Sequence, residues 1–119
     1  MISLWLPVAA WMAAIYYGAG MSAVPGPAAA ISDTFLHIAG YAGLALLTLR
    51  ATARGRWPGV TPGALVLAFV IAAVHGLTVE WRQIYVPSRS AEWRDVGNDV
   101  VGALAALIPA WAWSKIRTA

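Results

Sequence analysis

Long apolar stretches alternate with short polar segments along this chain, and four of the stretches are long enough to predict membrane-spanning helices. A spanning helix needs about 20 consecutive, predominantly apolar residues. The four predicted spans cover approximately residues 4–20, 33–49, 63–80 and 95–113. Because the connections between them are short, consecutive helices are predicted to be antiparallel neighbours. The pattern therefore predicts an all-α fold, an integral membrane bundle of four transmembrane helices formed by a single domain, residues 1–119.

The composition strengthens this prediction and excludes several other classes of protein. Hydrophobic residues make up 61% of the 119 residues and charged residues only 11%, whereas soluble domains have about 45–50% and about 25%. The absence of Cys excludes disulfide scaffolds and thiolate chemistry. The net charge is +3, but the basic residues are scattered among apolar stretches. They do not form the basic face that nucleic-acid binding requires.

The distribution of basic residues predicts the orientation of the spans. One side of the membrane would hold Arg50, Arg54, Arg56, Lys115 and Arg117; the other would hold Arg82, Arg89 and Arg94. Since cytoplasmic loops carry an excess of Lys and Arg, both termini are predicted to be cytoplasmic. A cleaved signal peptide is the alternative for the first span, with Ala28–Ala30 as its cleavage site. The first ten residues contain no Lys or Arg, which argues against this alternative.

Polar residues at or within the spans are the candidates for function, because an ionisable group near the membrane centre costs about 2.5–3.5 kcal/mol. Residues three or four positions apart share one face of a helix. Such groups are Asp33, His37 and Tyr41 on the second span, Glu80 and Gln83 on the third, and Asp95 and Asp99 on the fourth. The small residues Gly76 and Gly102 continue the faces of the third and fourth spans.

The antiparallel topology predicts that these groups converge. Asp33 opens the second span, Glu80 closes the third and Asp95 opens the fourth, so all three lie at the same, extracytoplasmic end. Arg89 lies in the loop above them. The predicted ligand-binding residues are therefore Asp33, His37, Tyr41, Glu80, Gln83, Arg89, Asp95 and Asp99.

Each of these residues also has a structural interpretation. Asp33 and Asp95 could act as favourable charges in the first turn of a helix. His37 could be a buried histidine bonded to a backbone carbonyl, and the Tyr41 hydroxyl could bond across helices. Arg89 could form an ion pair that holds the loop down.

Two further features are predicted to be structural. His75 lies five positions before Glu80 and is therefore rotated away from its face, which predicts a packing or interhelical hydrogen-bonding residue. The series Ala10, Ala14 and Gly18 places small residues four apart, which favours a close approach of two helices.

The polar motifs, taken in order, resemble the VanZ-like family. The family pattern Asp-x-x-x-His-x-x-x-Tyr, Glu-x-x-Gln-x-x-x-Pro-x-Arg and Asp-x-x-x-Asn-x-x-Gly is matched by Asp33, His37, Tyr41, Glu80, Gln83, Pro87, Arg89, Asp95 and Gly102. The resemblance extends from about residue 33 to the end of the fourth span. The chain departs from the pattern at Thr34, at Ser88 and at Asp99, which stands where the family has Asn.

The resemblance implies a class of protein and a location. VanZ-like proteins are small bacterial membrane proteins named for a member associated with resistance to teicoplanin-type glycopeptides. A multi-pass protein of the bacterial cytoplasmic (inner) membrane is therefore expected. The resemblance brings no chemical mechanism with it.

Three functional hypotheses follow. In the first, the polar cluster recognises an envelope lipid head group or a glycopeptide-related ligand, with an arginine engaging a phosphate or carboxylate. In the second, the chain is an intramembrane hydrolase or transferase, with Glu80, Asp99, His37 and Asp33 as candidate acid and base residues; the same residues could bind a divalent cation. In the third, the chain is an accessory subunit whose apolar faces dock a membrane-protein partner or a second copy.

Overall fold

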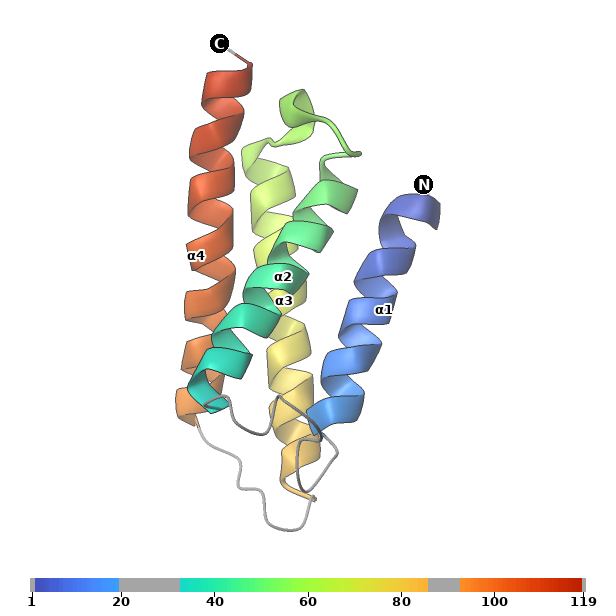
Figure 1. The fold of residues 1–119 in the computed structure, drawn as a ribbon, viewed down its shortest axis with the longest axis vertical. Coiled ribbons are helices and arrows are strands. Elements are labelled where there is room, and N and C mark those ends of the chain that lie inside the picture. Colours follow the sequence, from blue (N-terminus) through green and yellow to red (C-terminus); the bar gives the residue numbers. More distant parts are fainter. Residues whose placement is uncertain (1, 20–32, 86–92, 119) are drawn as a thin grey trace.

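The computed structural model describes residues 2–19, 33–85 and 93–118, with the side chains of residues 19 and 33 excepted. These residues form four α-helices and one short 3-10 helix (Figure 1). The helices are α1 (Ile2–Ala19), α2 (Asp33–Thr52), α3 (Pro62–Gln83) and α4 (Trp93–Arg117), and the 3-10 helix is η2 (Trp57–Gly59). The predicted all-α architecture is confirmed for the described residues.

Three of the helices are long and apolar enough to cross a membrane: α2, α3 and α4. With a rise of about 1.5 Å per residue, the 22 residues of α3 extend about 33 Å, and a bilayer core is about 30 Å thick. The apolar part of α1, Ile2–Gly18, is shorter than these three. The structure thus supports a membrane protein with three spanning helices, and the fourth predicted span stays a prediction.

The outward surface of these helices is apolar, as expected for helices that face lipid. Exposed side chains on α3 include Val66, Val70, Val74 and Leu77. Soluble monomeric proteins rarely expose such contiguous apolar surface, and within a bilayer it costs nothing because lipid tails are equally apolar.

Local interactions explain where α2 ends and where α3 begins. Thr61 caps α3, because its Oγ1 accepts a hydrogen bond of 3.1 Å from the Ala64 N–H. Pro62 occupies the first position of the helix, where a missing N–H is tolerated. After α2, Arg54 and Gly55 adopt positive φ angles of 57° and 72° and reverse the chain.

The helix α2 contacts all three other α-helices, whereas α1 packs against α2 and α3 (Figure 1). The N-terminal end of α1, the α2–α3 connection and the C-terminal end of α4 lie at one end of the bundle (Figure 1). We call this the basic end, because it carries Arg50, Arg54, Arg56, Lys115 and Arg117. The start of α2, the end of α3 and the start of α4 lie at the opposite end.

Small residues allow α2 and α4 to pack closely. Ala45, Ala103 and Gly102 are buried between helices, and a Cβ at Gly102 would overlap the backbone carbonyl of Ile38. The prediction that Gly102 continues a buried face of the fourth span is therefore confirmed, and the reason is an approach of one helix to the backbone of another.

The prediction that Ala10, Ala14 and Gly18 allow a close helix approach is wrong. Ala10 and Ala14 are exposed, and a Cβ at Gly18 would meet nothing within 4 Å. The helix α1 instead packs through Val8, Met12 and Ile15. Because α1 is apolar on all sides, its small residues do not indicate which face packs against the bundle.

Candidate functional site

Buried polar residues gather at the end of the bundle opposite the basic end. Tyr41, Gln83 and Asp99 are 1%, 3% and 2% exposed, and Glu80 and Asp95 are 9% and 8% exposed. We define the polar cluster as His37 and Tyr41 on α2, Glu80 and Gln83 on α3, and Asp95 and Asp99 on α4. Three helices thus contribute two residues each to this end of the bundle, as the spacing predicted.

His37 and Asp99 form the shortest polar contact of the cluster that we describe. The His37 Nδ1 atom lies 2.6 Å from the Asp99 Oδ1 atom. Since a carboxylate oxygen only accepts, Nδ1 carries the proton and donates it to this bond. The contact joins α2 to α4. The interpretation of His37 as a histidine bonded to a backbone carbonyl through this nitrogen is therefore replaced by a histidine–carboxylate pair.

Gly76 makes room for the Asp99 carboxylate. A Cβ at position 76 would lie 2.8 Å from Asp99 Oδ2 and 3.4 Å from its Cβ, closer than side chains normally pack. The small residue was predicted to continue the face of Glu80 and Gln83, and the structure explains its size: the carboxylate of α4 lies directly against the backbone of α3.

Tyr41 belongs to a second set of hydrogen bonds, which crosses three helices. Its hydroxyl lies 2.9 Å from His75 Nδ1, and His75 Nε2 lies 3.1 Å from the carbonyl oxygen of Met12. A carbonyl only accepts, so Nε2 carries a proton; in the neutral imidazole Nδ1 then accepts from the Tyr41 hydroxyl. Tyr41, His75 and Met12 thus join α2 to α3 and α1, and the prediction that His75 makes an interhelical hydrogen bond is confirmed.

The acidic residues of the cluster lie close to this tyrosine. Asp99 and Glu80 both interact electrostatically with the Tyr41 hydroxyl. Asp95 lies in the first turn of α4, where its charge is favourable to the helix dipole. It is nevertheless buried, so the helix dipole is not the only group with which its side chain interacts.

Two of the predicted site residues fall outside the part of the structure that is described. Asp33 begins α2, but its side chain is outside the described part, and Arg89 lies between α3 and α4 outside the described residues. Among the described residues, no group of three or more His, Asp or Glu side chains is arranged to hold a metal ion. The hypothesis of a divalent cation gains no support from these residues.

Arg82, in the last turn of α3, is directed towards α1. Its Nη1 atom donates a hydrogen bond of 3.2 Å to the Tyr16 hydroxyl, and its guanidinium carbon lies 4.4 Å from the centre of the Tyr16 ring. This is the geometry of a cation–π contact. Arg82 therefore fastens the end of α3 to α1 in the described structure.

One anchoring residue was not foreseen in the sequence. The Trp11 indole N–H donates a hydrogen bond of 2.8 Å to the Gly40 carbonyl oxygen, and a Cβ at Gly43 would lie 2.7 Å from the indole ring. The sequence shows a tryptophan on one predicted span and two glycines three positions apart on the next. This pattern does not predict that the tryptophan packs against those glycines.

The fold and the cluster together define a helical membrane bundle with buried ionisable residues near one end. Comparisons of the chain with protein-family models, with curated proteins and with solved structures gave no match. The resemblance to the VanZ-like family therefore stays a prediction from the motifs.

Proposed function

We propose that this chain is a VanZ-like protein of the cell envelope that recognises an envelope lipid head group, or a glycopeptide-related ligand, through the polar cluster. The observation that carries the proposal is the burial of Glu80, Gln83, Asp95 and Asp99, with His37 paired to Asp99, at one end of a bundle with an apolar outer surface. Ionisable residues within membrane segments are expensive, and they mark ligand or ion sites by default.

The chemistry of the cluster suits a ligand with hydroxyl and amide groups. Glu80, Asp95 and Asp99 offer carboxylate oxygens that accept hydrogen bonds, and Gln83 offers both an acceptor and two donors. Arg89, in the loop that joins α3 and α4, would supply the bidentate donor that a phosphate or carboxylate of the ligand requires.

The orientation is part of the proposal. Five basic residues lie at the basic end, and cytoplasmic segments carry such an excess. With α1 as a fourth span, both termini would be cytoplasmic and the polar cluster would face the extracytoplasmic leaflet of a bacterial cytoplasmic membrane, where envelope lipid head groups are accessible.

The test is mass spectrometry of the lipids that copurify with the protein. Wild type is compared with Glu80→Gln and Asp95→Asn, which remove a charge while keeping the shape of the side chain. Thr78→Val is the matched control, because Thr78 is exposed on α3 and its hydroxyl bonds only within its own helix in the described structure. A defined envelope lipid retained by wild type and Thr78→Val, and lost from both charge variants at equal folded yield, is expected. Bulk phospholipid alone in all four samples would refute the proposal.

A second function is favoured by the His37–Asp99 pair. A carboxylate that accepts from Nδ1 fixes the tautomer and the orientation of the imidazole, as in histidines that act as general bases. An intramembrane hydrolase or transferase would use this pair to activate water or a hydroxyl group. The same experiment separates the two functions: a chemically altered lipid present only with wild type and the control would favour the enzyme.

The accessory-subunit hypothesis makes a different prediction. If the cluster served only to fix the bundle, Asp99→Asn would change the amount of folded protein, and a stoichiometric membrane-protein partner would copurify with whatever protein remained.

A further inference from the structure

Among the described residues, the positive charge of the basic end has no acidic side chain near it. The five acidic residues of the chain are Asp33, Glu80, Glu92, Asp95 and Asp99. Four of them lie in the last turn of α3, the first turn of α2 or the first two turns of α4, and Glu92 directly precedes α4 in the sequence. In the described residues of the basic end, the arginines therefore have no carboxylate side chain to pair with.

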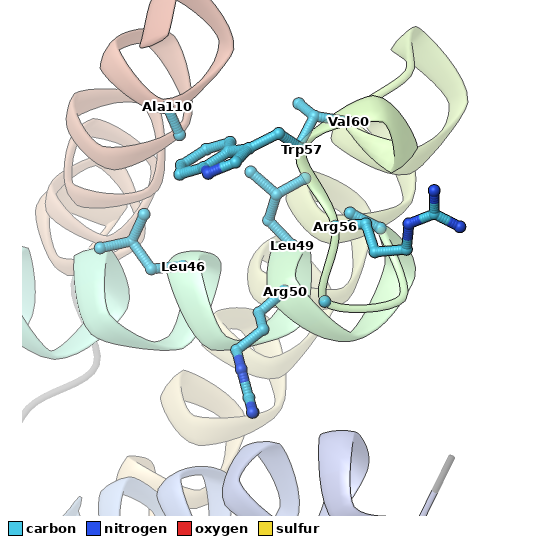
Figure 2. A pocket seen from close by; sticks show the side chains of 9 residues that line it. Leu46, Leu49, Arg50, Arg56, Trp57, Val60 and Ala110 are labelled. Carbon is cyan, nitrogen blue, oxygen red and sulfur yellow. The ribbon is translucent and has the colours of Figure 1, made fainter. Parts of the chain in front are cut away.

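A partly open pocket lies beside these arginines (Figure 2). Its volume is about 280 Å³. Its apolar walls come from three places: Leu46 and Leu49 on α2, Ala110 on α4, and Trp57 of η2. Figure 2 shows the Trp57 ring lying between Ala110 and the two leucines. The pocket is thus a hydrophobic hollow between α2, α4 and the segment that connects α2 to α3.

The side chains of two arginines complete the rim of the pocket. Arg50, in the last turn of α2, and Arg56, directly before η2, both line it. Their guanidinium groups extend away from the Trp57 ring and away from each other (Figure 2). This is the arrangement of snorkelling arginines, whose apolar stems cover hydrophobic surface while the charged heads reach the membrane–water interface.

The backbone of the connecting segment holds this shape. Arg54 and Gly55 reverse the chain with positive φ angles, and Gly59 packs so closely on the backbone of Ala53 that a Cβ at Gly59 would overlap the Ala53 carbonyl. Thr52 Oγ1 also donates a hydrogen bond of 3.1 Å to the Ala64 carbonyl oxygen, which ties the end of α2 to the start of α3. The hollow is therefore formed by ordered backbone before any ligand arrives.

The chemistry of the pocket identifies the class of its ligand. The volume lies near the lower end of the range of about 300–1,000 Å³ for sites of drug-sized ligands. Because its walls are apolar, the hollow suits a segment of a flexible apolar chain. The arginines beside it prefer an anion, and guanidinium groups bind phosphate well. An acyl chain linked to a phosphate satisfies both requirements, and the membrane supplies such molecules at high concentration.

We propose that the pocket at the basic end binds one anionic phospholipid, with part of an acyl chain against Leu46, Leu49 and Trp57 and the phosphate at the rim, where the flexible side chains of Arg50 and Arg56 would turn towards it. This site is separate from the polar cluster at the other end of the bundle. Its occupant comes from the leaflet on the basic side, whereas the polar cluster takes its ligand from the opposite leaflet.

The experiment is native mass spectrometry of the purified full chain in mild detergent, titrated with phosphatidylglycerol or phosphatidylcholine of identical acyl chains. Variants are Arg50→Gln, Arg56→Gln and the double variant. The matched control is Lys115→Gln with Arg117→Gln, which removes the same charge from the same end but does not touch the pocket. All of these side chains are exposed, so the folded yield should stay near that of wild type.

Wild type is expected to bind one phosphatidylglycerol in preference to phosphatidylcholine. Each basic residue near an anionic lipid contributes about 1 kcal/mol, so each arginine substitution should weaken binding of phosphatidylglycerol about fivefold. The control pair should stay within about twofold of wild type, because long-range attraction is screened by salt. Equal weakening by the arginine pair and the control pair, or equal binding of both lipids by wild type, would overturn the proposal.

Discussion

The hydrogen bond between Tyr41 and His75 should stabilise the bundle by an amount that can be measured. Tyr41→Phe removes the hydroxyl that lies 2.9 Å from His75 Nδ1 and leaves the ring in place. A buried acceptor that loses its donor costs about 1–3 kcal/mol in soluble proteins, and hydrogen bonds between membrane helices contribute about 0.6 kcal/mol on average and about 1.7 kcal/mol at most. Because Tyr41 is 1% and His75 7% exposed, neither water nor lipid can replace the hydroxyl. We expect a loss of about 1 kcal/mol.

The assay is equilibrium unfolding of the protein in mild micelles by a denaturing detergent, followed by circular dichroism. Tyr16→Phe is the matched control, since the Tyr16 hydroxyl also accepts a hydrogen bond, from Arg82 Nη1, but the residue is 39% exposed. Exposed sites usually change stability by less than about 0.5 kcal/mol. Tyr41→Phe should therefore be clearly more destabilising than the same substitution at Tyr16.

A double-mutant cycle isolates the contact itself. Tyr41→Phe, His75→Ala and the double variant should give an interaction free energy of about 1 kcal/mol, within the range of about 0.5–3 kcal/mol found for residues in contact. If Tyr41→Phe cost no more than Tyr16→Phe and the cycle gave a coupling near zero, the assignment of this hydrogen bond as a helix-joining contact would be refuted.

Further predictions concern the packing of α2 against its neighbours and use the same unfolding assay. Gly102→Ala should lower the free energy of unfolding by about 2 kcal/mol or more, because its new methyl group would overlap the Ile38 carbonyl and overpacking usually costs about 1–3 kcal/mol. Gly97→Ala is the control, since a Cβ at Gly97 meets nothing within 4 Å. It should be neutral or stabilise α4 by up to about 1 kcal/mol. A similar loss at both glycines would contradict this packing. Trp11→Phe should cost about 1 kcal/mol by removing the hydrogen bond to the Gly40 carbonyl, and an unchanged stability would show that this bond does not hold α1 to α2.

The spacing of residues in the sequence was enough to predict which faces of α3 and α4 are buried. Glu80 and Gly76, and likewise Asp99 and Gly102, lie three or four positions apart and are all buried. Polar and small residues at these intervals are rare on a lipid-facing surface, so their positions mark the interior of the bundle. Antiparallel topology then predicted the common end without knowledge of any distance.

The packing of α1 could not be predicted in the same way. Its residues are apolar on every side, so no contrast of polar and apolar positions indicates the inner face. Two hydrogen bonds mark the inner face of α1 in the structure: one from Trp11 to the Gly40 carbonyl, and one from His75 to the Met12 carbonyl. Hydrogen bonds to backbone carbonyls leave no signature in the sequence of the accepting helix.

The partners within the polar cluster were equally hidden in the sequence. His37 and Asp99 are 62 positions apart, and helical spacing gives the face of each residue but not the rotation of one helix against another. That rotation is determined by the close approach of α4 at Gly102 to the Ile38 carbonyl. The contact fixes the register of α2 and α4, and it is this register that brings the imidazole next to the carboxylate.

The hydrogen bonds of Tyr41 and those of His37 contribute differently to the packing of the helices. The Tyr41–His75–Met12 series joins three helices with neutral groups, and it holds α1, the helix with the least contact to the rest. The His37–Asp99 pair joins α2 and α4, which already pack closely through Gly102. Removing a histidine and a carboxylate from water carries a desolvation cost that can offset the interaction between them, so a bundle that needed only stability would gain little from this pair. In the proposed function His37 and Asp99 form part of the ligand site, whereas the bonds of Tyr41 and His75 join helices.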